Sequence, residues 1–271
     1  MRFPFSRIAV IATLAFGLAA CSEDSPTDNN DNLDAQFAAS AEVAAEVSGY
    51  VETAATAYSM ANTVPGLAKS TAPTEMLLAC PNLSFDVQAK TFTLDYGTGC
   101  TGKDGKTRSG SITVQYSGKL STGATLTLTY NNYKTGNKTF NGTMAATVSN
   151  SNTVALVINN ATVTDDKGNA TINANLTMTA DLKGTPQNPD DDVYTISGSG
   201  TVAEGGKTYS FTITDPLIFQ VGCNFPTSGK MTVNSGDSQP ASIDFFPDNG
   251  ACDDVAVVTI GNMSKRITLG S

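Results

Sequence analysis

The stretch TINANLTMTA, residues 171–180, decides the fold class. Its apolar side chains fall on every second position: Ile172, Ala174, Leu176, Met178 and Ala180. The positions between them carry only threonine and asparagine. A period of two predicts a β-strand with one buried face and one face in water, which is typical of an antiparallel sheet.

The same alternation recurs outward along the chain, in residues 91–96, 112–116, 125–130 and 209–214. Turn-forming segments separate these runs: 104–105, 135–137, 165–168 and 204–206. We therefore predict an all-β domain over residues 76–271, an antiparallel meander that forms a sandwich or a curled, partly open barrel. Membrane-spanning barrels alternate too, but the small and medium apolar residues and the absence of tryptophan favour a soluble form.

One short helix is expected before the strands, in a segment that covers residues 34–64. Asp34 can cap its start, and Pro65-Gly66 would end it. An apolar stripe at three- and four-residue spacing predicts its packing face: Val43, Val47, Tyr50, Ala54, Tyr58 and Ala61. Gly49 interrupts the helix at a cost of about 1 kcal/mol relative to alanine.

Composition excludes several classes of function. The 271-residue chain has a net charge of −9, 15% charged residues and no histidine. The missing histidine removes the usual Ser-His-Asp and Cys-His machinery and the commonest zinc ligand. The acidity argues against nucleic acid as a partner, because binding to phosphates needs a basic face. No cofactor is predicted.

The N-terminal residues have the pattern of a secretory signal peptide. Residues 1–20 combine two arginines with an apolar run, as a signal peptide does, and are too short for a comfortable membrane span. The sequence Leu18-Ala19-Ala20-Cys21 resembles the lipobox of bacterial lipoproteins. That resemblance implies that Cys21 is acylated and becomes the mature N-terminus; the alternative is an ordinary secreted protein. Two or three acyl chains would anchor the protein almost permanently.

Residues 21–33 are expected to form a flexible, acylated linker, because they are polar and contain proline. In the lipoprotein scheme, Ser22 after the cysteine implies sorting to the outer membrane. The stretch Ser22-Glu23-Asp24 also resembles the acidic surface-export tag of Bacteroidetes-type lipoproteins, although it is equally consistent with a merely polar tether. Both the periplasmic and the cell-surface face therefore stay open.

Four cysteines remain after Cys21, and an even count in an oxidising compartment predicts two disulfides. Three connectivities exist. We favour Cys80 with Cys100 and Cys223 with Cys252, because each pair brackets one expected strand pair. The rival interpretation, a four-thiolate metal site, is disfavoured because no Cys-x-x-Cys occurs.

The two cysteine regions resemble an uncharacterised family of Bacteroidetes-type outer-membrane lipoproteins. The resemblance covers residues 80–269 and rests on segments 94–100, 104–114, 222–223, 243–245 and 250–254. It implies architecture and location and no activity. Asp95 and Asp244 occupy equivalent places in these segments, where a solvated or turn-capping role is favoured over a ligand role.

Candidate chemistry is sparse. Asp190, Asp191 and Asp192 form the densest acidic cluster and are weak calcium candidates, but they lack the alternating spacing of a calcium loop, so we favour a solvated connection and predict no metal site. Hydrolase motifs that depend on histidine are excluded. A glycosidase needs only two carboxylates, but no aromatic-lined acid pair is visible.

These observations predict a lipid-anchored protein of the outer membrane that is not an enzyme. Its expected role is binding, adhesion or envelope structure, with the membrane as partner through the acyl chains and a glycan or a protein as ligand. The alternative is a carrier of an apolar ligand inside the curled sheet. A carboxylate-based glycan hydrolase is the third hypothesis.

Overall fold

The computed structural model describes residues 28–62, 64, 67, 80–102, 105–150, 152–183, 191–223, 225–236, 238–247 and 249–269. Within this part of the chain, the all-β antiparallel fold with a helix near the N-terminus is confirmed. Thirteen strands form one sheet in which spatial order equals sequence order, so every neighbouring pair is antiparallel and the chain is a pure meander. The sheet is open rather than closed into a barrel.

The strands of the first half of the sheet are β1 (Asn82–Asp86), β2 (Thr91–Thr101), β3 (Thr107–Lys119), β4 (Gly123–Thr135), β5 (Lys138–Asn150), β6 (Thr153–Thr164) and β7 (Asn169–Asp181). Those of the second half are β8 (Val193–Glu204), β9 (Lys207–Gln220), β10 (Ser228–Asn234), β11 (Ala241–Asp244), β12 (Val255–Ile260) and β13 (Met263–Thr268). The strands β2 to β9 are long, and those from β10 onward are short.

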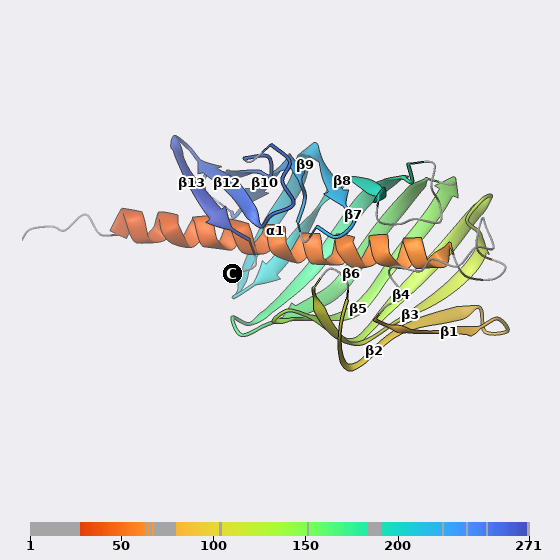
Figure 1. The fold of residues 1–271 in the computed structure, drawn as a ribbon. Coiled ribbons are helices and arrows are strands. Elements are labelled where there is room, and N and C mark those ends of the chain that lie inside the picture. The colour runs from red at the N-terminus through yellow and green to blue at the C-terminus, as the bar shows by residue number, and fades with distance from the viewer. Residues whose placement is uncertain are drawn as a thin grey trace, which may run out of the picture.

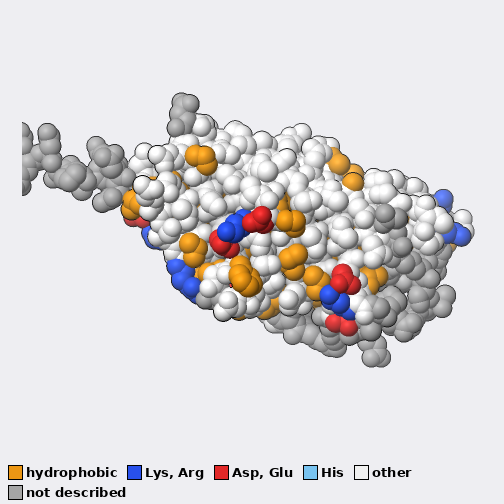
Figure 2. Space-filling view, turned by 90° about the horizontal axis from the view of Figure 1, so that it is seen from above, with side chains coloured by type: hydrophobic (Ala, Val, Ile, Leu, Met, Phe, Trp, Pro, Cys, Tyr) orange, Lys and Arg blue, Asp and Glu red, His pale blue; other side chains and the backbone are white. Residues whose placement is uncertain are grey.

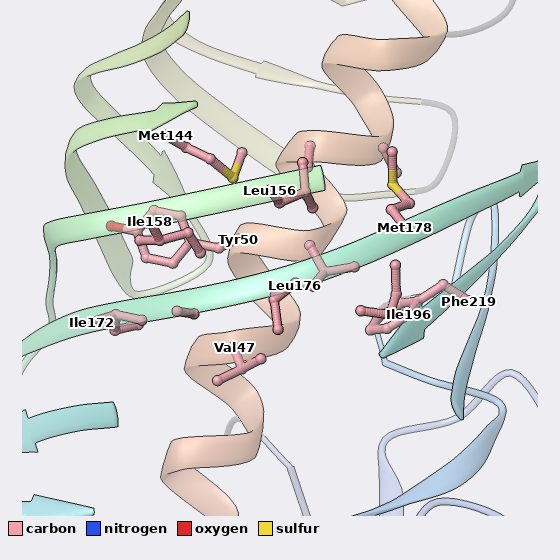
Figure 3. Packing of buried hydrophobic residues seen from close by; sticks show 14 of the residues in the cluster. Val47, Tyr50, Met144, Leu156, Ile158, Ile172, Leu176, Met178, Ile196 and Phe219 are labelled. Carbon is pink, nitrogen blue, oxygen red and sulfur yellow. The ribbon is translucent and has the colours of Figure 1, made fainter. Parts of the chain in front are cut away.

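The alternating pattern places the core as expected. In β7 the five predicted inward residues are all buried, at 3% exposure or less, while their threonine and asparagine neighbours are partly or fully exposed. Figure 3 shows apolar side chains of neighbouring strands directed toward the helix, among them Leu156, Leu176 and Met178, which lie with Val47 in one cluster. One face of the sheet therefore makes the core together with the helix.

Helix α1 (Asp28–Ala61) is longer than predicted. The prediction of a start at Asp34 and of a short helix is wrong, because α1 has 34 residues, about 51 Å at 1.5 Å per residue. The linker predicted from polarity over residues 21–33 therefore overlaps the helix at residues 28–33. Polarity does not forbid a helix, and no proline occurs between Pro26 and Pro65.

The curled sheet covers α1 from Phe37 to its end at Ala61, where most residues are buried. Figure 1 shows the helix running across one face of the sheet, with β1 and β2 toward one end and β12 and β13 toward the other. The backbone of α1 comes close to β10, β11, β12 and β13, and Tyr50 of α1 packs edge-on against Tyr130 and Phe140 of β4 and β5. The predicted apolar stripe is buried, and so are most residues between its members. A helix buried all round is a core element rather than a surface helix.

A row of bulges gives the sheet its curl. In β4 and β6, Asn132 and Asn160 adopt positive φ angles of 50° and 48° beside shifts in register. Each of their backbone N–H groups donates to a side-chain carbonyl on the next strand, of Asn141 at 3.1 Å and of Asn173 at 2.8 Å. Bulges bend and twist a strand, so the two equivalent irregularities bend the sheet around α1.

Tyr50 joins this bend to the helix. Its hydroxyl lies 3.2 Å from the backbone carbonyl of Asn141 and 3.0 Å from that of Thr162, on the bulged stretches of β5 and β6. The phenol hydroxyl can therefore donate a hydrogen bond to carbonyl groups that would be paired between strands in a regular sheet. Helix and curl are thus parts of one core.

Candidate functional site

Three acidic residues of α1 meet the hairpin ends at one rim of the sheet. Glu52 lies 2.7 Å from the ammonium of Lys106 and 2.8 Å from the guanidinium of Arg108, both beside the β2–β3 turn. Nearly three turns earlier along the helix, Glu42 pairs with Lys138 of β5 and lies 3.2 Å from Lys167. The rim is therefore fixed to the helix by ion pairs as well as by the apolar core.

The Glu42–Lys138 pair lies largely out of water. Both residues are buried, and Lys138 also lies 3.1 Å from the carboxylate of Asp165, at the tip of the β6–β7 hairpin. Burial by itself would lower the pKa of Lys138, but hydrogen bonds to Glu42 and Asp165 outweigh it and the pKa is raised. Lys138 is thus held charged by two carboxylates.

Glu46 is the unusual member of this group. Its side chain is 2% exposed, and its Oε2 has no hydrogen-bond partner among the described residues. Burial raises the pKa of this carboxyl from 4.5 to about 8, against the lowering effect of Lys138. Glu46 is therefore protonated at neutral pH, which avoids the large cost of an unpaired buried charge.

A cleft of about 740 Å³ opens between α1 and the same rim. Its floor comes from the middle of the helix, at Ala45 and Gly49, and from Phe140. Its walls come from the β2–β3 hairpin end, the β4–β5 hairpin end and three C-terminal positions: Phe225, Asp254 and Leu269. The volume is within the range of small-molecule sites, about 300–1,000 Å³.

Both predicted disulfides are confirmed, and each is close in sequence to residues that line this cleft. The Cys80–Cys100 bond has Cα atoms 5.6 Å apart and adjoins Gly99, which lines the cleft. The Cys223–Cys252 bond has Cα atoms 5.2 Å apart and lies within two residues of the lining residues Phe225 and Asp254. Each cross-link therefore joins two chain segments next to part of the cleft lining.

The other predicted residues have mixed outcomes. Leu18, Ala19, Ala20, Cys21 and Asp190 lie outside the described residues. Asp191 is exposed, as a solvated connection requires. That interpretation is wrong for Asp192, which is 4% exposed and accepts a hydrogen bond from the hydroxyl of Tyr194 at 3.2 Å.

The turn-capping role favoured for Asp95 and Asp244 is confirmed. Their carboxylates accept hydrogen bonds from the backbone N–H two residues later, of Gly97 and of Phe246, both at 2.9 Å. Within the described part of the chain, no three acidic or cysteine side chains gather closely enough to hold a metal ion.

Sequence reasoning missed the acidic residues of the helix and their partners at the rim. Glu42 and Glu46 are one turn apart within an otherwise apolar and small-residue segment, so two acids in a buried register were a signal. Their partners Lys138 and Asp165 sit at hairpin ends, where charged residues usually point to water. Nothing local predicted that the helix would reach them.

Comparison of the chain with protein-family models, with curated proteins and with solved structures finds no match. Membership of the lipoprotein family stays a prediction. Among the described helical residues, no stretch is long and apolar enough to cross a bilayer.

Proposed function

We propose that the protein is a lipid-anchored, non-catalytic binding protein of the outer membrane, and that it binds its ligand in the cleft between α1 and the hairpin ends. The observation that carries the proposal is the cleft itself, about 740 Å³ in volume, with one disulfide next to the lining residue Gly99 and the other near Phe225 and Asp254. A concave, pre-formed site with an apolar floor and polar walls is the usual form of a ligand site. The anchor rests on the lipobox at Leu18-Ala19-Ala20-Cys21.

The composition of the outer face of the sheet favours the cleft, rather than that face, as the binding site. The outward positions are dominated by threonine and asparagine. In the face shown in Figure 2, charged side chains form only a few small groups, and in the two near the middle of the face acidic and basic members are neighbours. Such a surface offers solubility and little that would single out one partner, so we assign binding to the cleft.

The carrier alternative gains no support from the inside of the curl. Apolar side chains of β4 to β9 pack against α1, as Leu156, Leu176 and Met178 do in Figure 3. An apolar ligand would have to replace the helix, at the cost of its buried side chains and of the ion pairs of Glu42 and Glu52. The cleft needs no such rearrangement.

A cleft-blocking variant tests the proposal. Thr98 is exposed and lines the cleft, so Thr98→Trp should fill part of it without disturbing the core. Thr127→Trp places the same side chain on the outer face of β4 and is the matched control. Detergent-solubilised protein is applied to a panel of immobilised envelope and extracellular polysaccharides. We expect at least one to bind wild type and Thr127→Trp but not Thr98→Trp; binding that both variants retain would contradict the proposal.

A further inference from the structure

The charges that line the cleft differ in balance from those of the whole chain. The protein has 25 acidic and 16 basic residues. The cleft, in contrast, is lined by four basic residues, Lys106, Arg108, Lys134 and Lys138, and by two acidic ones, Glu52 and Asp254. Basic residues therefore outnumber acidic ones in the lining, the reverse of the whole chain, and charges that line a concavity act on a ligand more strongly than charges on an open surface.

Two of these cations, Lys106 and Arg108, are held in fixed positions in the cleft lining by Glu52. The single carboxylate of Glu52 lies between Lys106 at 2.7 Å and Arg108 at 2.8 Å, so this group of three carries one net positive charge. Their side chains are only 11–19% exposed, which limits screening by water and fixes their positions. Lys134 is exposed in the cleft lining and adds a further positive charge, which the exposed carboxylate of Asp254 in the same lining balances. Lys138 adds little, because Glu42 and Asp165 neutralise it.

The remaining lining suits a saccharide better than a small anion. Four residues with hydroxyl groups line the cleft at the two hairpin ends, Thr98, Thr107, Ser109 and Thr135, and the hydroxyl of Thr107 is paired with that of Thr101. Phe225 is partly exposed and adds an aromatic ring to the lining. Hydroxyls match the donors and acceptors of sugars, and an aromatic face packs against their C–H groups. A cleft of about 740 Å³ would leave a free phosphate or sulfate ion mostly in bulk water.

We infer that the cleft binds an acidic saccharide, a glycan whose carboxylate or sulfate groups meet the Lys106–Arg108–Glu52 group and Lys134 while its rings lie along the hydroxyl-lined walls. The inference rests on the proposed function and narrows its ligand to one chemical class. The guanidinium of Arg108 is suited to an oxyanion because it presents several N–H donors in a planar fork.

Two matched pairs of probes test this inference: polygalacturonate against its methyl ester, and dextran sulfate against dextran. Each pair keeps the sugar and removes the charge. Binding to detergent-solubilised protein is measured at low and at high salt for wild type, Lys134→Gln and Thr98→Trp. Lys119→Gln, an exposed lysine at the opposite end of β3, is the charge-matched control.

We expect at least one acidic probe to bind about tenfold or more tightly than its neutral partner, with binding weakened by salt. Lys134→Gln should weaken it about threefold, the size expected of one exposed ion pair, Thr98→Trp should abolish it, and Lys119→Gln should leave it unchanged.

If the charged and the neutral probe of a pair bind equally and Thr98→Trp abolishes both, the inference is overturned, but the proposed function of the cleft as a ligand site stands. Binding of an acidic probe that neither Thr98→Trp nor Lys134→Gln changes would overturn the inference, and it would also contradict the proposed function. No binding of any probe would overturn the inference alone.

Discussion

Gly49 lies where helix α1 and the ring of Phe140 come closest. A Cβ atom at this position would stand 2.6 Å from Cζ and 2.9 Å from Cε1 of the ring, which is 1% exposed and packed against Tyr50 and Tyr133. Real side chains do not approach so closely, so the ring would have to move. The glycine that weakens the helix is therefore a requirement of its packing.

This contact reverses the usual effect of replacing a helical glycine. Gly→Ala in a helix normally stabilises by about 1 kcal/mol, but crowding a packed core costs about 1–3 kcal/mol. We expect Gly49→Ala to lower the free energy of unfolding by about 1–2 kcal/mol, measured by urea denaturation. In a Phe140→Leu background the same substitution should cost less. A stabilised Gly49→Ala protein would contradict the packing described.

Glu46 gives the molecule a pH dependence that ordinary carboxylates do not. Below pH 4.5 the carboxyl is protonated in both the folded and the unfolded chain, and its contribution to stability is fully present. Between pH 4.5 and about 8 only the folded chain keeps the proton, so stability is lost as the pH rises. The slope is at most about 1.4 kcal/mol per pH unit.

The variant Glu46→Gln isolates this effect, because the amide does not titrate. We expect the free energy of unfolding of wild type to fall relative to Glu46→Gln as the pH is raised from 5 to 8, measured by urea denaturation at each pH. Asp215→Asn, which removes an exposed carboxyl of β9, is the control and should leave the slope unchanged. A difference between wild type and Glu46→Gln that does not vary with pH would show that the carboxyl is ionised throughout.

At the scale of elements, the paired asparagine bulges determine how the strands bend. The N–H of Asn160 depends on the side chain of Asn173, and its loss would leave a strained backbone without an acceptor. Asn175, two residues further along β7 on the same outer face, is exposed. We expect Asn173→Ala to destabilise the protein by about 1 kcal/mol, and Asn175→Ala by less than about 0.5 kcal/mol. Thermal unfolding measures both, and equal effects would argue against the bulge.

The features that could be predicted from the sequence are those that depend on residues close together in the chain. Alternation such as that of Ile172 and Leu176 depends on neighbouring residues, so the strands, the meander and the disulfide pairing followed from it. The bulges could have been noticed, because Asn131-Asn132 and Asn159-Asn160 recur in equivalent strands. The burial of Glu46 and the cleft could not, since both arise where α1 meets hairpin ends about 60 to 160 residues away in sequence.

At the scale of the whole molecule, the predicted anchor lies close in sequence to the start of the helix that enters the core. Cys21 precedes the first residue of α1, Asp28, by seven positions. Seven extended residues span at most about 25 Å, so an acylated Cys21 would hold the start of α1 within about that distance of the membrane. The helix that fills the curled sheet would then also be the element through which the body is tethered.

The lipid anchor is tested most directly by the mass of the N-terminal peptide of protein that has been extracted from membranes with detergent. We expect the mature chain to begin at Cys21 and to carry a diacylglycerol thioether, and Cys21→Ser to abolish both the modification and the membrane association. A mature chain that begins at another residue, or an unmodified Cys21 in membrane-extracted protein, would contradict the lipid anchor and with it the proposed function.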